Sequence, residues 1–85
     1  MLEQIKEAIE AELPGAFVHV ASPDGRHFQA IVVSEVFANV PLLKQHRLVM
    51  LALKERFDGE AVHAMQLKTF SPEKWDLVKA DYHLG

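Results

Sequence analysis

The sequence predicts an α+β fold with the order helix, strand, strand, helix, strand, helix. Apolar residues recur at helical spacing in two long segments, and two β-rich runs lie between these segments. A third β-rich run follows the second segment and precedes the start signal of a C-terminal helix. The simplest packing is a three-stranded sheet with helices packed on one face. Because 85 residues suffice for one domain and not for two, residues 1–85 are expected to form a single domain.

The N-terminal segment predicts an amphipathic helix that ends at the Pro14-Gly15 pair. Its apolar positions are Leu2, Ile5, Ile9 and Leu13. Residues 16–34 then predict a β-hairpin, since two β-rich runs flank a Pro-Asp-Gly turn at 23–25. Gly25 is expected to take a positive φ in this turn.

A short helical turn is expected near residues 35–38, followed by a second long helix with Pro41 in its first turn. The apolar stripe expected to face the sheet is Leu42, His46, Val49, Met50, Leu53 and Phe57. The third strand is expected within residues 61–70. Ser71 then suits a helix N-cap, Pro72 the first helical position and Glu73 the first turn of a helix that runs to about Val78.

Composition excludes several classes of protein. The formal charge of −3 argues against binding nucleic acid by electrostatics alone, since that requires clustered Lys and Arg. The absence of cysteine excludes disulfides, a thiolate nucleophile and a self-sufficient Cys-ligated metal site. No apolar run approaches the roughly 20 residues that span a bilayer, and the N-terminus is unlike a secretory signal. We therefore expect a cytoplasmic protein that binds no membrane.

The sequence contains none of the common short motifs that carry catalytic chemistry. There is no Gly-rich phosphate loop, no G-x-S-x-G, no H-E-x-x-H and no C-x-x-C. A triad could be drawn from Ser22, Asp24 and His27, but three local loop residues without an oriented base or an oxyanion hole do not indicate one. The protein is therefore expected not to be an enzyme.

Five histidines are the unusual chemical feature of the chain. By strand alternation His63 shares a face with Met65 and Leu67, which leaves two interpretations from the residues alone: a structural histidine beside the core, or a ligand. His27 follows the hairpin turn and is expected to be partly exposed. His19 is expected on the solvent face of its strand.

Three segments resemble the BolA family when taken together: "HFQAIVVSEVF", "PLLKQHRLVMLAL" and "VHAMQLKTFSPEKW". Their order and spacing match over nearly the whole chain, and the hairpin is similar to that of the shorter bacterial BolA-like proteins linked to acid response. The resemblance implies an α-β-β-α-α-β-α fold, related to one type of KH domain.

The resemblance also implies a function as a non-enzymatic adaptor in iron-sulfur trafficking or in sensing iron or stress. BolA-like proteins form heterodimers with monothiol glutaredoxins and share a 2Fe-2S cluster that the glutaredoxin and glutathione also hold. The position of the recurring ligand is His63 here, and the second candidate is His27. No cofactor is expected for the isolated protein, which would be a monomer or a weak homodimer.

A partner surface is expected next to these ligands. Its residues would be His46, Arg47, Lys68, Thr69 and Phe70. Phe70 can equally be read as a core-edge aromatic and Lys68 as a solvated strand end. The alternative function is a KH-like nucleic-acid-binding transcriptional regulator, which the acidic balance disfavours and which would use a basic helix face. That face would consist of Lys44, Arg47 and Lys54.

The chain departs from the family pattern in the connection before the long helix. Where the family has Phe-x-Gly, this sequence reads "FAN", with Asn39 at the glycine position and Val40 after it. Asn tolerates left-handed φ better than other non-glycine residues, so the turn is expected to survive. The surface that this loop presents would differ.

Overall fold

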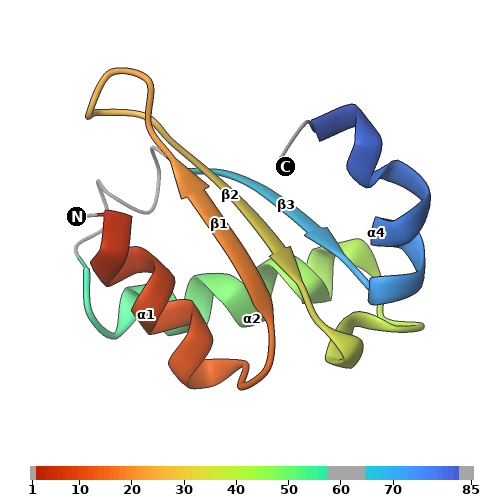
Figure 1. The fold of residues 1–85 in the computed structure, drawn as a ribbon. Helices are drawn as coiled ribbons and strands as arrows, with labels where there is room; N and C mark the ends of the chain where they lie inside the picture. Colours follow the sequence, from red (N-terminus) through yellow and green to blue (C-terminus); the bar gives the residue numbers. More distant parts are fainter. Residues whose placement is uncertain (1, 58–64, 83–85) are drawn as a thin grey trace.

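Three strands form one mixed sheet in the order β1-β2-β3, with helices before, between and after them (Figure 1). The structure is a computed structural model that describes residues 2–57 and 65–82. Its helices and strands are α1 (Leu2–Glu12), β1 (Phe17–Ala21), β2 (Phe28–Val33), α2 (Leu42–Lys54), β3 (Met65–Phe70) and α4 (Pro72–Val78). Two short 3-10 helices, η1 (Glu35–Phe37) and η2 (Lys79–Tyr82), complete the order.

The sheet combines an antiparallel hairpin with one parallel pair. β1 pairs antiparallel with β2, with Val18 opposite Val32, whereas β2 pairs parallel with β3, with Phe28 opposite Met65. A parallel neighbour requires a crossover, and α2 lies in that connection. The predicted α+β class with a three-stranded sheet is confirmed.

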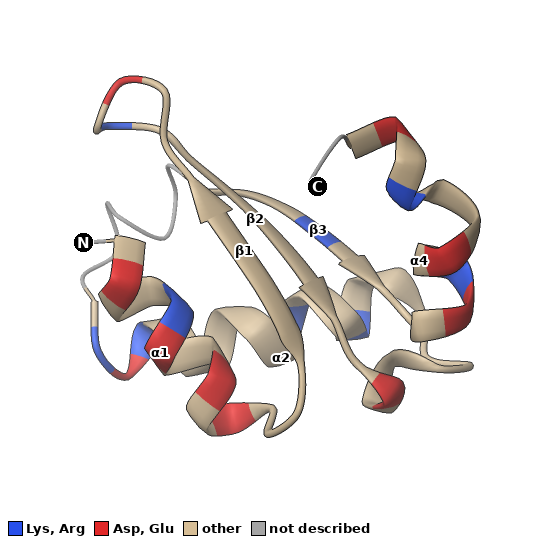
Figure 2. Cartoon of the chain, viewed as in Figure 1, with Lys and Arg blue, Asp and Glu red and all other residues tan. Residues whose placement is uncertain are grey.

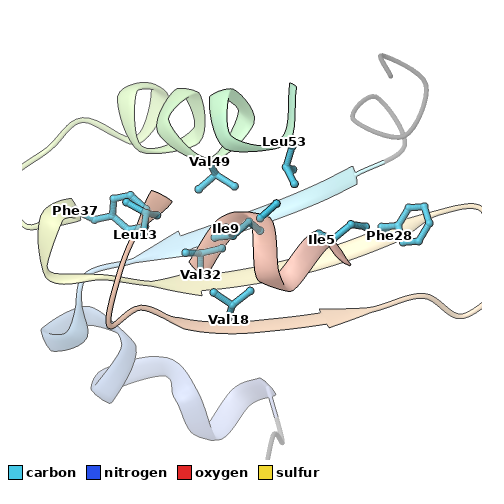
Figure 3. Packing of buried hydrophobic residues seen from close by; sticks show 10 residues of the cluster. Ile5, Ile9, Leu13, Val18, Phe28, Val32, Phe37, Val49 and Leu53 are labelled. Atoms are coloured by element: carbon cyan, nitrogen blue, oxygen red, sulfur yellow. The ribbon is translucent and has the colours of Figure 1, made fainter. Parts of the chain in front are cut away.

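The core lies between one face of the sheet and the helices α1 and α2 (Figure 3). Alternation along β1 and β2 turns Val18, Phe28 and Val32 toward this face, where they meet helix residues at helical spacing. The other residues of this cluster come from α1, the position directly after it, η1 and α2: Ile5, Ala8, Ile9, Leu13, Phe37, Val49 and Leu53. The predicted N-terminal helix is confirmed, and Ile5, Ile9 and Leu13 of its predicted apolar stripe are buried, whereas Leu2 in its first turn is exposed.

The predicted stripe of α2 needs one correction. Val49 and Leu53 are buried, and Met50 packs against the core as expected, but Leu42 is largely exposed. The buried position in the first turn is Gln45 instead. Because α2 carries leucines on both sides, the apolar spacing alone does not identify the side that faces the sheet.

The C-terminal helix is an exception to the predicted packing on one face. Whereas α1 and α2 cover the core face, α4 lies on the opposite side of the sheet (Figure 3). Trp75 of α4 contacts Phe17 of β1 and Phe70 of β3, with ring centroids 5.9 and 5.5 Å apart respectively. Phe17 and Phe70 flank Val33 in one cross-strand row, so a single indole covers that row and draws α4 onto this face.

The connection from β2 to α2 turns at a left-handed residue. Ser34 caps η1 by accepting a hydrogen bond from the Val36 amide, and Asn39 has a φ of 61°. The prediction that Asn39 supplies the left-handed turn is confirmed. Gly25 likewise has a positive φ of 76°, as expected for the hairpin turn.

None of the helices in residues 2–57 and 65–82 is long and apolar enough to cross a bilayer.

Candidate functional site

The loop between β1 and β2 is held by its own side chains. The Asp24 carboxylate oxygen Oδ1 accepts hydrogen bonds from the Arg26 and His27 amides, both at 2.8 Å. Ser22 Oγ accepts from the Gly25 amide at 2.8 Å and donates to the His27 carbonyl at 2.7 Å. These bonds satisfy the turn backbone and fix the loop that carries His27.

His27 is oriented by the same carboxylate. Its Nδ1 lies 2.7 Å from Asp24 Oδ2, and its side chain is 74% exposed. Because an ionised carboxylate can only accept, the ring donates through Nδ1–H, and the neutral ring then carries its free lone pair on Nε2. An open Nε2 on an exposed ring can bind a metal ion.

Asp24 stays ionised in this arrangement. The His27 amide, the His27 ring and the Arg26 amide all hydrogen-bond its charged form, and they lower the pKa of this carboxyl well below its usual range. The acceptor that orients His27 is therefore present at neutral pH.

Ser22, Asp24 and His27 come together, but not as a catalytic triad. Asp24 binds the imidazole, whereas the Ser22 hydroxyl donates to the backbone carbonyl of His27 and not to its ring. A nucleophile requires contact with its base, and this contact is missing between these three residues. The loop orients one imidazole without activating a hydroxyl.

The strand register brings the start of β3 next to the end of this loop. His27 directly precedes Phe28, whose partner on β3 is Met65. His63, the predicted ligand, lies two residues before Met65 in the sequence and outside the described residues. Among the residues that the structure describes, no three His, Asp or Glu side chains gather in a way that could hold a metal ion.

The five predicted partner residues do not share one surface. Arg47 and Lys68 are exposed, but they lie on α2 and on the outer face of β3, and His46 is half-buried on α2. Phe70 packs against Trp75. Thr69 is buried, so its side chain faces the interior and is not available to a partner.

Gln45 is a positioning residue that the sequence did not indicate. This buried side chain donates through Nε2 to the carbonyl oxygens of Phe37 and Val40, at 3.3 and 2.7 Å. Its Oε1 accepts from Thr69 Oγ1 at 2.7 Å. One amide thus joins α2 to the loop before it and to β3, and it satisfies both carbonyls.

The cations of the predicted nucleic-acid face are exposed together on α2. These are Lys44, Arg47 and Lys54. Arg47 and Lys54 line a shallow groove with Met50 and Leu51. All charged residues of α2 are basic, whereas α1 is mainly acidic (Figure 2).

Comparisons with known proteins agree with this architecture. The chain is 38% identical over 58 residues to the acid stress protein IbaG of Escherichia coli K12, covering 68% of each chain. It is 28% identical over 83 residues to the DNA-binding transcriptional regulator BolA of the same organism, covering 87% of this chain and 78% of that protein.

The fold also matches a solved structure of a BolA protein homologue from Coxiella burnetii. The TM-score is 0.74 at 36% identity, and the match covers 89% of this chain and 96% of that one. The family profile described as BolA-like protein matches residues 4–74. The chain therefore belongs to the BolA-like protein family.

Proposed function

We propose that this protein is a non-enzymatic adaptor that pairs with a monothiol glutaredoxin and contributes imidazole ligands to a shared 2Fe-2S cluster. The observation that carries the proposal is the His27 ring, which Asp24 holds at 2.7 Å through Nδ1 and whose Nε2 bonds to none of the residues that the structure describes. A metal-binding histidine commonly donates the N–H of its other ring nitrogen to a carboxylate in this way.

The donor set fits a cluster that two proteins share. A 2Fe-2S centre has four protein ligands, two on each iron, and imidazoles can replace both thiolates on one of the irons. This chain has no cysteine to supply the two thiolates on the other iron. The thiolates would therefore come from the glutaredoxin cysteine and glutathione. When bound, such a cluster would supply iron and sulfide for transfer, or a redox-active sensor.

His27 and His63 are the proposed ligands from this chain. His63 rests on the family resemblance, and its distance from Met65 in the sequence is compatible with a position near the hairpin. The pairing of Phe28 with Met65 supports this assignment, since it brings the start of β3 beside the residue that follows His27.

Titration with a cluster-loaded monothiol glutaredoxin tests the proposal. Visible absorption and circular dichroism should show a new spectrum that saturates at one-to-one stoichiometry. His27→Ala and His63→Ala should each abolish this spectrum, whereas His19→Ala, on the outer face of β1, should preserve it. If the spectrum of the glutaredoxin homodimer persisted throughout the titration, the adaptor function would be wrong.

Nucleic-acid binding is the second candidate function. The exposed Lys44, Arg47 and Lys54 on α2 favour it, as does the similarity to a relative named as a DNA-binding regulator. Three phosphate contacts would give a slope of about −3 for log affinity against log salt. Binding to duplex DNA across a salt series, with and without Arg47→Ala, measures this slope.

A further inference from the structure

The outward side of α2 exposes more apolar surface than a solvated helix needs. Leu43, Leu48 and Leu51 are 62, 40 and 60% exposed, although the inward side of the same helix is well buried. Scattered exposed leucines are ordinary, but three on one side of a helix of 13 residues form a patch of the kind found at interaction sites.

The leucines alternate with cations along one side of the helix. Residues three and four apart are neighbours on a helix, so Leu43, Arg47 and Leu51 form one row, and Lys54 extends it by one turn. Lys44 and Leu48 form the adjacent row. We define the α2 outer face as Leu43, Lys44, Arg47, Leu48, Leu51 and Lys54.

The charge of this face opposes that of the rest of the molecule. All of its charged residues are basic, while the chain carries a formal charge of −3 and the exposed side of α1 is rich in glutamate (Figure 2). Such a face attracts an acidic partner and repels another basic surface.

We propose that the α2 outer face docks an acidic amphipathic helix of a partner protein. Apolar side chains of the partner would cover Leu43 and Leu51, and its carboxylates would pair with Arg47 and Lys54 at the edge. One apolar side chain of the partner would enter the shallow groove, which is lined by Arg47, Met50, Leu51 and Lys54.

Two other occupants fit the face less well. A nucleic acid would pair with the cations, but it would leave the exposed leucines in water. A second copy packed through α2 would oppose like charges, since Lys44, Arg47 and Lys54 would meet their own counterparts. The α1 helix of a second copy offers carboxylates. Among the described residues of α1, however, Leu2 is the one large apolar side chain that is exposed, which is too little to cover the leucines of α2.

The α2 outer face shares no residue with the hairpin loop that carries the proposed cluster ligand His27. The loop extends from one end of the sheet, and α2 lies against its core face (Figure 1). Cluster sharing could fail while docking persists, and docking could fail while the cluster spectrum persists.

Synthetic peptides test the face directly. The acidic probe is an amphipathic helix of about 18 residues, long enough to be helical, with Leu on one side and Glu elsewhere. A matched probe carries Lys in place of each Glu. With isotope-labelled protein, the acidic peptide should shift amide signals of α2 and bind at least about tenfold more tightly than the basic peptide. Equal binding of both peptides, or no binding, would overturn the proposal.

Variants separate the apolar and the charged contributions. The double substitution Leu43→Ser with Leu51→Ser should weaken binding of the acidic peptide at least about tenfold, because binding would remove the apolar surface of both leucines from water. Leu77→Ser, at an exposed leucine of α4, is the matched control and should leave affinity unchanged. Unchanged thermal unfolding would show that both variants remain folded.

Rival occupants give different results in the same assay. Binding of a duplex DNA probe that depends on Arg47 and not on Leu43 or Leu51 would assign the face to nucleic acid and overturn the proposal. Sedimentation that shows a concentration-dependent dimer, lost in the double leucine variant, would assign it to a second copy and also overturn it.

Discussion

The hairpin loop and α2 expose side chains in two different ways. In the loop, the hydrogen bonds of Ser22 and Asp24 fix the direction of a single ring, that of His27. On α2, the buried side chains of the inward side hold the helix against the sheet. The outward side is a broad surface of leucines and cations, and no hydrogen bond within the described part of the chain fixes the direction of any of these side chains. Oriented atoms suit coordination of a ligand atom, whereas apolar area with a charged edge suits recognition of another surface.

The inward side of α2 should be the most sensitive to substitution. Gln45→Ala removes the donor to the Phe37 and Val40 carbonyls and the acceptor of the Thr69 hydroxyl. Leaving buried polar groups unpaired should lower the free energy of unfolding by about 2–3 kcal/mol, measured by urea denaturation.

The outward side provides the control for this experiment. Leu43→Ser changes a largely exposed side chain, so the free energy of unfolding should stay within about 0.5 kcal/mol of the parent. Equal losses from the two substitutions would mean that the two sides of α2 do not differ as the structure indicates.

The second effect concerns the orientation of His27. Asp24→Asn keeps Oδ1 as an acceptor for the amides of Arg26 and His27, but it replaces Oδ2 with an amide group that cannot accept from the ring. The neutral ring should then lose its preference for the Nδ1–H form, which long-range proton–nitrogen NMR detects in the isolated protein. Loss of such an orienting carboxylate typically weakens metal binding about 10- to 100-fold.

An exposed aspartate elsewhere serves as the control. Asp76→Asn removes a carboxylate of α4 that pairs with Lys79 and is remote from the loop. The ring of His27 should keep its proton on Nδ1 in this variant. If Asp24→Asn also left the ring unchanged, then Asp24 would not orient His27.

Acid should loosen the hairpin loop before it affects α2. The pKa of Asp24 is lowered in the folded protein, mainly by the His27 amide, so ionised Asp24 stabilises the folded loop above its ordinary pKa of about 4. This contribution declines as the pH falls from that value toward the folded pKa. The amide signals of Arg26 and His27 should report the loss in an NMR titration below pH 4, and Asp24→Asn should remove this titration.

Much of the fold could be predicted because local patterns agreed with it. The stripe of α1, the Pro-Asp-Gly turn and the Ser71 cap each act over a few residues, and the Ser71 hydroxyl accepts from the Lys74 amide as a cap should. The side of the sheet that α4 covers could not be predicted in this way. It depends on the register that aligns Phe17 with Phe70, which are 53 residues apart in the sequence.

The candidate site could be predicted only in part. Family resemblance indicated His27, but the residue that orients it follows from the fold of the turn, where an Asp three residues before a His is the available signal. The burial of Gln45 depends on carbonyls that its own segment does not reveal. His63 stays a prediction, since it lies outside the described residues.

The turn that leads into α2 should respond less to substitution than the helix or the hairpin loop. Asn39 has a φ of 61°, a conformation that glycine adopts without steric cost. Asn39→Gly should therefore change the free energy of unfolding by no more than about 0.5 kcal/mol, since the relief of strain offsets the added freedom of the unfolded chain. Asn39→Ala should lower it by about 1 kcal/mol, because a β-carbon without a local hydrogen-bonding group is disfavoured there. Urea denaturation of both variants measures the difference. If the alanine variant were as stable as the glycine variant, the left-handed φ of Asn39 would not be what positions the start of α2. The hydrogen bonds from the Gln45 side chain to the Phe37 and Val40 carbonyls would then position it alone.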